Sequence, residues 1–297
     1  MRPYFIVNPI AGGGKAAELF GRVKQYLKEK RADFGYVMTD KAGQSTALAD
    51  EAYENGERFI VAVGGDGTIN EVASSLYNKD DVVMGVLPFG TGNDFARVLS
   101  MPTDPDEAAE TLISGEAVPV DIGMADDKPF VNAGGLGFDV DVVINTEKFK
   151  HRFHGMIPYL LGVIKSLAHL RAKHVKLTAD GENIEEDAMI LAVANGSHFG
   201  GGMAVAPEAD ATDGLFDVCL IKSMGLLKVL TVLPKFIKGR HVGLKVVKYF
   251  RAKEIKVECE ESPIQLDGEL GRFAPVTFRI LPGALRMMLP KRAAKPQ

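Results

Sequence analysis

The feature that most constrains the fold of this chain is a repeated pattern in its first half, where short apolar runs alternate with stretches of helical spacing. Four runs have the length and composition of buried strands, at 3–7, 36–39, 59–63 and 82–87. Helical spacing separates or follows them, at 16–30, 45–55, 69–77 and 95–99. Because strands that alternate with helices tend to pair in the same direction, the first half is predicted to form a parallel sheet with helices on both faces.

The second half has a different pattern, since short β-type runs follow one another with few helices between them. The runs lie at 131–133, 175–179, 188–194, 215–221, 254–257, 264–266 and 276–281. Asp-Gly pairs that favour tight turns separate several runs, at 180–181, 213–214 and 267–268. Helices are expected only near 156–172 and 225–239. The second half is therefore predicted to be a separate, mostly-β domain.

Composition fits an ordinary globular protein and excludes several other classes. Of the 297 residues, 46% are hydrophobic and 25% are charged, which allows a substantial core. The two cysteines, Cys219 and Cys259, have no metal-ligand spacing, so two reduced thiols in a cytosolic protein are expected. No apolar run approaches the ~20 residues that a membrane-spanning helix needs, and the first residues lack the pattern of a signal peptide. The expected location is cytoplasmic.

Charge is distributed unevenly along the chain. Residues 1–147 carry 12 basic and 24 acidic side chains, whereas residues 148–297 carry 23 and 15. Two stretches, 148–179 and 222–253, contain no acidic residue, and each includes one of the helices expected in the second half. Apolar helix faces are expected at Ile157, Leu160, Leu161, Ile164 and Ala168, and at Leu226, Leu230, Leu233 and Ile237.

An apolar face beside lysines suits an anionic membrane surface, because each nearby cation contributes about 1 kcal/mol there. Peripheral attachment at the inner face of the cytoplasmic membrane is therefore expected. The alternative is that both helices pack on the β domain and their cations are solvated. Nucleic acid is a poorer partner, because the chain is acidic overall and has no basic motif interleaved with aromatic residues.

Three polar, glycine-rich loops follow strands of the first half, at 8–17, 64–68 and 88–94. In open parallel sheets, ligands bind outside the carboxyl ends of the strands, and glycine lets backbone amides approach phosphate oxygens. Three such loops on one edge predict a nucleotide site. The first loop alone is a weak signal: it fits a relaxed dinucleotide pattern, and Pro9 and Ala16 exclude a phosphate-binding P-loop.

The loop at 64–68 is more informative, because it joins a clean strand to a clean helix. A simple Asp-Gly turn is the alternative. The functional interpretation places Asp66 in a nucleotide–magnesium site and gives the Thr68 hydroxyl a phosphate to bind.

Five blocks in this order resemble the diacylglycerol kinase catalytic-domain family, in its soluble bacterial lipid kinase branch. They are Asn8-Pro9 with the glycines after it, GGDGTINE at 64–71, PFGTGNDFAR at 88–97, NGSHFGGGMAVAPEADATDGLFDV at 195–218, and Asp-Gly-Glu at 267–269. The GGDGT loop is shared with NAD kinases. The blocks at 88–97 and 195–218 make the resemblance specific to lipid kinases, and together the five span most of the chain.

The resemblance implies a fold of the NAD kinase and diacylglycerol kinase type. An α/β nucleotide-binding domain would occupy 1–124 and would be joined by the C-terminal tail, 284–297. A mostly-β, sandwich-like lipid and catalytic domain would occupy 125–283, with the active site in the cleft. The residues that would contact ATP are Asn8, Gly12, Gly13, Gly14, Thr39, Gly64, Gly65, Asp66, Gly67, Thr68, Ile69, Asn70 and Thr91.

The resemblance also implies three catalytic carboxylates. Glu269 would be the general base, with Asp267 beside it, and Asp66 would act in the first domain. A base is chemically reasonable, since a lipid alcohol has a high pKa and its attack on phosphorus benefits from a carboxylate that accepts the proton. Two positions apart in extended backbone, 267 and 269 would face the same side. The alternative is a hairpin turn whose acids face water.

A structural Mg²⁺ site is the last element that the resemblance implies. Asp213 would supply its side chain, and Asp210 and Leu215 their backbone carbonyls. An EF-hand is excluded, because alanines occupy the first ligand positions of such a loop. An ordinary Asp-Gly turn is the alternative.

The expected function is that of a lipid kinase that uses ATP and Mg²⁺ to phosphorylate a lipid alcohol such as diacylglycerol, a step of phospholipid biosynthesis. An NAD kinase and a non-catalytic lipid or nucleotide sensor are the alternatives. The sequence leaves open which lipid is used and whether the chain forms a homodimer.

Overall fold

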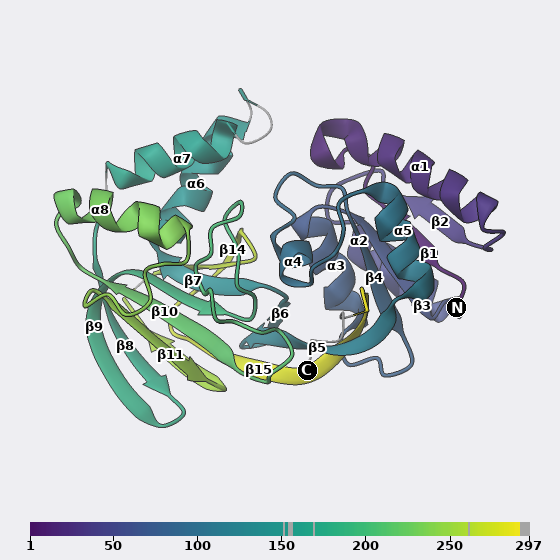
Figure 1. Cartoon of the computed structure of the whole chain (residues 1–297). Coiled ribbons are helices and arrows are strands. Elements are labelled where there is room, and N and C mark those ends of the chain that lie inside the picture. The colour runs from purple at the N-terminus through teal and green to yellow at the C-terminus, as the bar shows by residue number, and fades with distance from the viewer. Residues whose placement is uncertain (151, 154–156, 169, 261, 292–297) are drawn as a thin grey trace, which may run out of the picture. The chain divides into compact units, whose positions relative to one another are not determined.

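The computed structural model describes residues 1–150, 152–153, 157–168, 170–260 and 262–291 (Figure 1). The chain divides into two compact units. The first comprises Met1–Val120 with Gly283–Gln297, and the second comprises Asp121–Pro282. Met156 and position 169 of the first helix expected in the second half lie outside the described residues, as do the last six residues of the tail.

The first unit is built on a parallel sheet, as predicted. Its strands are β1 (Tyr4–Val7), β2 (Gly35–Met38), β3 (Phe59–Gly64) and β4 (Val83–Pro88), in the order β2-β1-β3-β4. Met287, near the end of β15 (Val276–Leu289), pairs in parallel with Met84 of β4. After β2 the chain crosses over β1 to form β3 on its other side, so the strand order reverses between β1 and β3. Such a switch point is where open α/β sheets bind ligands.

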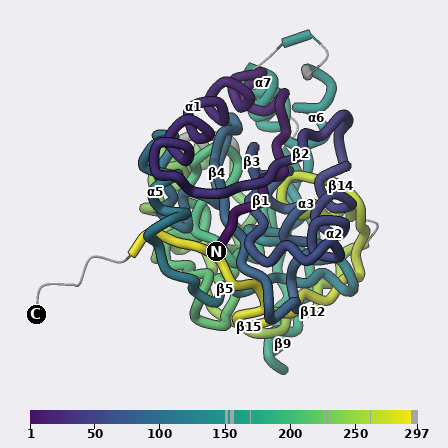
Figure 2. The backbone as a smooth tube through the Cα atoms, turned by 90° about the vertical axis from the view of Figure 1, so that its right-hand side faces the viewer, coloured from purple at the N-terminus to yellow at the C-terminus, as the bar shows by residue number. Residues whose placement is uncertain are grey.

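Helices cover both faces of this sheet. Helices α1 (Lys15–Glu29) and α5 (Pro105–Ser114) lie together on one face, and α2 (Ser45–Glu54) and α3 (Asp66–Leu76) lie on the other (Figure 2). Two shorter helices, η1 (Ala11–Gly14) and α4 (Asp94–Val98), follow β1 and β4. In α1 the buried residues Phe20, Val23 and Leu27 recur at helical spacing and pack on the core below the strands.

The second unit is mostly β and antiparallel, which confirms the predicted sandwich-like second domain at the level of fold. Its strands are β5 (Glu116–Ala125, which begins in the first unit), β6 (Lys128–Phe130), β7 (Ala133–Gly137), β8 (Lys173–Ala179), β9 (Glu182–Ala194), β10 (Phe216–Lys222), β11 (Val247–Ala252), β12 (Glu254–Glu258), β13 (Pro263–Leu266), β14 (Glu269–Phe273) and the first part of β15. They follow the order β14-β13-β7-β9-β8-β12-β15, and β10 joins β9 to β11. Phe130 stacks on Phe216 and meets Phe278 edge-on in the core.

The described residues of the second unit include the helices α6 (Phe138–Lys150), α7 (Ile157–Leu167) and α8 (Leu226–Ile237). The last two match the helices expected there, whereas α6 was not predicted. Val140, Val142, Val143 and Ile144 give it a β-type composition. Contacts with α7 and β13 stabilise the helix despite these residues. Across the described residues, no helix has the length and apolar character to cross a membrane.

Candidate functional site

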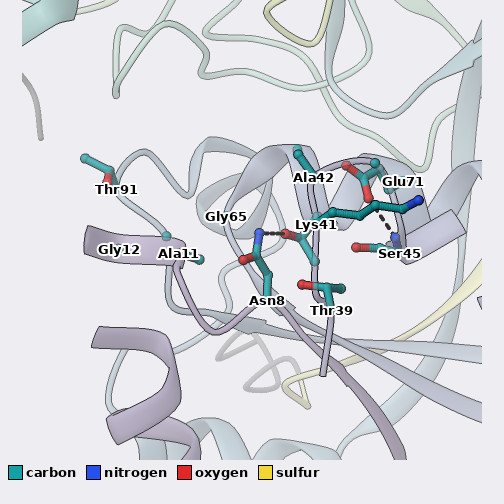
Figure 3. A pocket seen from close by; sticks show the side chains of 14 residues that line it. Asn8, Ala11, Gly12, Thr39, Lys41, Ala42, Ser45, Gly65, Glu71 and Thr91 are labelled. Atoms are coloured by element: carbon teal, nitrogen blue, oxygen red, sulfur yellow. Dashed lines mark hydrogen bonds between the residues drawn. The ribbon is translucent and has the colours of Figure 1, made fainter. Parts of the chain in front are cut away.

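A pocket lies at the carboxyl ends of the first unit's strands (Figure 3). It is lined by Asn8, Ala11, Gly12, Thr39, Lys41, Ala42, Gly43, Ser45, Gly65, Gly67, Thr68, Glu71, Gly90 and Thr91. These residues follow β1, β2, β3 and β4, so all four strand ends contribute. The pocket therefore occupies the sheet edge at which the sequence predicts a nucleotide site.

The loop after β1 has a backbone that only glycine adopts readily. Gly12, Gly13 and Gly14 all have positive φ angles, of 62°, 71° and 91°. A Cβ atom on Gly12 would also lie 2.5 Å from the carbonyl oxygen of Phe89, in the loop after β4. The first loop is thus pressed against the third, and α1 begins directly after it.

The second and third loops also meet through glycine. A Cβ atom on Gly90 would lie 2.2 Å from the Cα of Gly65, so Gly90 has no room for a side chain, and a Cβ on Gly65 would lie 3.2 Å from the Cα of Gly90. A Cβ on Gly64 would lie 2.6 Å from the hydroxyl oxygen of Thr68. The missing side chains leave backbone groups lining this part of the pocket, as a phosphate-binding edge requires.

Asn8 and Thr68 form a polar pair at the switch point between β1 and β3. The Asn8 side-chain amide donates to the Thr68 hydroxyl over 3.1 Å, and the Asn8 backbone N–H donates to Val63 over 2.9 Å. The Thr68 hydroxyl accepts from Asn8 and keeps its own proton for another acceptor. The side-chain oxygen of Asn8, Oδ1, is buried and has no hydrogen-bond partner among the described residues.

Asp66 links the second loop to the third. Its Oδ1 accepts the backbone N–H of Phe95 over 3.1 Å, and a Cβ on Gly92 would lie 2.8 Å from its Oδ2. Burial raises the pKa of Asp66, and the charge of Asp94 adds to that effect, while hydrogen bonds from backbone amides lower it. The carboxylate is therefore held by the loop that follows β4 and stands at the first turn of α3.

The structure separates the residues that the sequence suggests for ATP into three groups. Asn8, Gly12, Thr39, Gly65, Gly67, Thr68 and Thr91 line the pocket. Gly13, Gly14, Gly64 and Asp66 belong to the same loops or their ends without lining it, and Asn70 and Ile69 are buried within α3. Their contacts with a nucleotide stay predictions.

Of the part of the pocket that follows β2, sequence reasoning named only Thr39 and missed the residues after it. Lys41 and Ser45 line the pocket there, and Glu71 of α3 accepts the backbone N–H of Ser45 over 2.9 Å. The signal was present, since the same strand-end rule that selects the glycine loops applies to β2 as well. Lys41 supplies a cationic side chain to the pocket, whose lining also includes the acidic Glu71.

In the second unit, the Asp-Gly-Glu triplet forms the hairpin between β13 and β14. Asp267 and Gly268 both have positive φ angles, of 49° and 84°, which is the backbone of a tight two-residue turn. The expectation that 267 and 269 lie two apart in extended backbone was therefore wrong, because Asp267 is itself a residue of the turn and Glu269 begins the next strand. Whether both act in catalysis stays a prediction.

The Asp267 carboxylate is occupied by backbone groups. It accepts three N–H groups, from Val131 over 2.7 Å and from Asn132 and Ala133 over 2.9 Å each. Its own N–H donates to the Ala133 carbonyl over 2.9 Å. These contacts fasten the turn to the segment that enters β7, so the geometry favours a positioning contribution for this carboxylate.

Glu269 begins β14 and is exposed. Its carboxylate has no hydrogen-bond or ion-pair partner within the described residues. It differs in this from Asp267 two residues earlier. An exposed carboxylate on a firmly held turn is chemically able to accept a proton from a substrate hydroxyl.

The predicted Mg²⁺ ligands lie in one tight loop before β10. Asp213 Oδ1 accepts the Leu215 N–H over 3.0 Å, and the Asp210 carbonyl accepts the Asp213 N–H over 3.3 Å. The oxygen donors suit Mg²⁺, but Asp213 Oδ2 also lies 3.7 Å from Arg251. In the part of the chain that the structure describes, no three His, Cys, Asp and Glu side chains gather into a metal site. Two of the three predicted ligands are backbone carbonyls, and the assignment stays a prediction.

Comparison with known families accounts for nearly the whole chain. Residues 2–125 match the diacylglycerol kinase catalytic domain, and residues 133–289 match the YegS C-terminal NAD kinase beta sandwich-like domain. The first match corresponds to the α/β unit of the structure, and the second corresponds to the mostly-β unit with β15.

Individual proteins show the same likeness. The chain is 32% identical to a diacylglycerol kinase of Bacillus subtilis, over 99% of this chain and 98% of the relative. It is 34% identical to a probable YegS-like lipid kinase of Pseudomonas putida, over 87% of each. The crystal structure of a putative diacylglycerol kinase from Bacillus anthracis is similar with a TM-score of 0.82 and 28% identity, covering 98% of this chain and 97% of that one.

Proposed function

Because the chain belongs to the diacylglycerol kinase family and is therefore a kinase, we propose that it transfers the γ-phosphate of ATP to the hydroxyl of diacylglycerol or a similar lipid. The product would be phosphatidic acid or a related lipid phosphate, a precursor in phospholipid biosynthesis. The observation that carries this proposal is the pocket in which four parallel strand ends and three glycine-bearing loops meet.

The pocket supports ATP as the donor. Strand-end glycines expose backbone N–H groups, and α1 and α3 begin beside them, so the positive ends of two helices favour negative charge there. Thr68 offers a hydroxyl proton, and Lys41 offers a cation to a phosphate oxygen. Asp66 keeps the loops after β3 and β4 in register for this contact.

The chemical step assigned to the second unit is proton removal from the lipid hydroxyl by Glu269. As the hydroxyl oxygen forms its bond to the γ-phosphorus, the bond from that phosphorus to the bridging oxygen breaks, and ADP leaves with the bonding electrons. The hydroxyl proton passes to the Glu269 carboxylate. Asp267 holds the turn that carries this base.

Mg²⁺ would be held by the Asp213 side chain and the carbonyls of Asp210 and Leu215. Bound there, the ion would compensate carboxylate charge in the loop before β10. The structural support is limited to the oxygen chemistry of these donors and the closeness of the three residues in one turn.

Helix α7 supports a peripheral membrane role because it buries small residues and exposes large apolar ones, the reverse of the usual arrangement. Its small residues Pro158, Gly162 and Ser166 are buried, and Ser166 accepts a hydrogen bond from Asn145 of α6 over 2.9 Å. Its large residues point away from that contact: Ile157 is 53% exposed, Leu160 59% and Ile164 58%. A helix that exposes its bulky apolar side chains has a face fitted to another apolar phase.

Helix α8 has a conventional buried face and a basic exterior. Among the described side chains, Val229, Val232 and Phe236 are buried, whereas Leu233 and Ile237 of the expected apolar face are half-buried and exposed. Leu226 and Leu230 belong to the same expectation, but their side chains lie outside the described part of the structure. Ile237 is 45% exposed and Leu227 83%, beside exposed lysines at 228, 235 and 238. We assign both helices to contact with an anionic membrane surface.

Vesicle sedimentation tests the membrane assignment. Leu160→Glu/Ile164→Glu should lower binding to phosphatidylglycerol-containing vesicles about tenfold or more, since it places two charges in the apolar phase. Ile113→Glu on α5, which replaces an equally typical exposed apolar residue (47% exposed), is the matched control and should bind like the wild type. Equal binding by all three proteins would remove α7 from the membrane contact.

A calorimetric titration with a non-hydrolysable ATP analogue tests the pocket. Gly90→Ala drives a Cβ to 2.2 Å from the Gly65 backbone and should weaken binding about 100-fold or more. Gly21→Ala, where no atom lies within 4 Å of the added Cβ, should leave binding unchanged. Unchanged affinity in Gly90→Ala would place the nucleotide elsewhere.

A radiolabel assay with γ-labelled ATP and a panel of acceptors tests the function itself. Transfer to diacylglycerol in mixed micelles is the expected result. Transfer to phosphatidylglycerol or a sphingoid base instead would change the acceptor, and transfer to NAD without lipid would favour the NAD kinase alternative. Vesicle binding without ATP turnover on any acceptor would identify a sensor.

A further inference from the structure

Asp139, at the second position of α6, is linked by side chains to the turn that carries Glu269. Its Oδ2 accepts a hydrogen bond of 3.1 Å from the side-chain amide of Gln265. The carbonyl oxygen of the same Gln265 side chain accepts the Gly268 N–H over 2.8 Å. The link therefore ends at Gly268, the residue directly before the proposed base Glu269.

The link has little freedom to rearrange. Gln265 is 3% exposed, and a Cβ on Gly135 would lie 2.8 Å from Asp139 Oδ2, so β7 closes the space beside the carboxylate. A carboxylate can only accept, so it fixes which end of the Gln265 amide faces it. The opposite end, the carbonyl, must then face the Gly268 N–H.

A second Asp-Gly-Glu triplet in the chain isolates what is special about this link. Residues 180–182 form the hairpin between β8 and β9, and Asp180 and Gly181 have positive φ angles of 46° and 90°. Asp180 accepts the backbone N–H groups of Lys253 and Glu254, much as Asp267 accepts those of 131–133. The local turn is therefore the same in both places.

The two hairpins differ at the residue two positions before the aspartate. Gln265 is buried and contacts Asp139 and Gly268, whereas Thr178 is exposed and its hydroxyl donates to Asn183 on the neighbouring strand. The hairpin at 178–183 forms the same turn without a buried carboxylate beside it, so such a carboxylate is not needed to form the turn. The extra support is present where the proposed base is.

We propose that Asp139 is a positioning residue, which acts through Gln265 to hold the 267–268 turn so that the Glu269 carboxylate meets the lipid hydroxyl. The inference rests on the proposed role of Glu269 as general base. Together with the Asp267 contacts, it fastens the turn to both ends of β7: to 131–133 at its start and to the first turn of α6 just after its end. Loss of the Asp139 link would leave the hairpin folded, but the Glu269 carboxylate would be held less firmly in position.

Burial is consistent with such a role. It raises the pKa of Asp139 to about 6, and Oδ1 is buried with no hydrogen-bond partner among the described residues. A carboxylate in such surroundings is unfavourable for stability, and groups of this kind cluster at functional sites.

The test exchanges the donor and acceptor of the link. Gln265→Glu places a second carboxylate against Asp139 and should lower kcat about 10- to 100-fold, with the KM for ATP within about twofold of wild type. Adding Asp139→Asn lets the new amide donate to the new carboxylate, and should restore kcat to within about threefold. Failure of the double variant to recover, with both proteins folded by thermal melting, would overturn the proposal.

A second series separates this inference from the function on which it rests. Asp139→Leu should lower kcat about tenfold or more in the wild-type background, but less than about twofold when Glu269→Gln is already present. Equal losses in both backgrounds would show that Asp139 acts elsewhere, which overturns the inference. Full activity of Glu269→Gln alone would instead remove the proposed base. If Asp139→Leu does not fold, the test rests on the comparison of Gln265→Glu with Gln265→Glu/Asp139→Asn.

Discussion

The two Asp-Gly-Glu hairpins of the second unit have the same triplet and the same turn, but different surroundings. At 180–182 the aspartate caps a neighbouring strand on the surface, and Thr178, two positions before the aspartate, is exposed. At 267–269 the aspartate holds three amides and a buried glutamine braces the turn against Asp139. The local sequence therefore specifies a turn, and contacts with distant segments distinguish a candidate catalytic base from a surface acid.

Removing each turn aspartate is expected to give a large difference between the hairpins. Asp267→Ala deprives three backbone amides of their acceptor and should lower kcat about 10- to 100-fold, because the base is no longer held. Asp180→Ala, the matched control, should change kcat less than about twofold. Steady-state kinetics in mixed micelles measures both. Equal losses in the two variants would mean that Asp267 supports only the fold.

The pH dependence of stability gives a smaller effect that concerns the bracing carboxylate alone. The pKa of Asp139 is raised in the folded protein to about 6 from the ordinary value of 3.8, so the folded state binds the proton more tightly than the unfolded state does. The unfavourable contribution is fully present above the folded pKa and disappears as the pH falls below the unfolded pKa.

Asp139→Asn should therefore stabilise the protein on the order of 2 kcal/mol at about pH 7, and this advantage should vanish near about pH 4. Urea unfolding of wild type and variant at both pH values measures the difference, in which the contributions of other titrating groups cancel. A difference that does not change with pH would show that the carboxylate is solvated in the folded protein.

Much of the fold and one part of the site could be predicted from sequence. The parallel sheet and the glycine loops are local patterns: each strand, loop and following helix is contiguous, and Gly12, Gly65 and Gly90 are needed for conformation or close approach. The buried face of α8 was not predicted, because Val229 and Val232 lie on a second apolar face of the same helix.

The support of the base could not be predicted, because it depends on pairs far apart in sequence. Asp267 contacts a segment about 135 residues earlier, and Gln265 contacts Asp139, 126 residues away. Nothing near Asp139 marks it as special, since α6 itself has a β-type composition. The part of the pocket after β2 was a different case: the strand-end rule covers Lys41, but no glycine motif drew attention to it.

The central claim is that the Glu269 carboxylate accepts the proton of the lipid hydroxyl during phosphate transfer from ATP. The most direct measurement is the rate of label transfer from γ-labelled ATP to diacylglycerol by Glu269→Gln and by Glu182→Gln, the same change in the other triplet. We predict a loss of about 10²- to 10⁴-fold for the first, with unchanged affinity for ATP, and wild-type rates for the second. Comparable rates for the two variants would contradict the account.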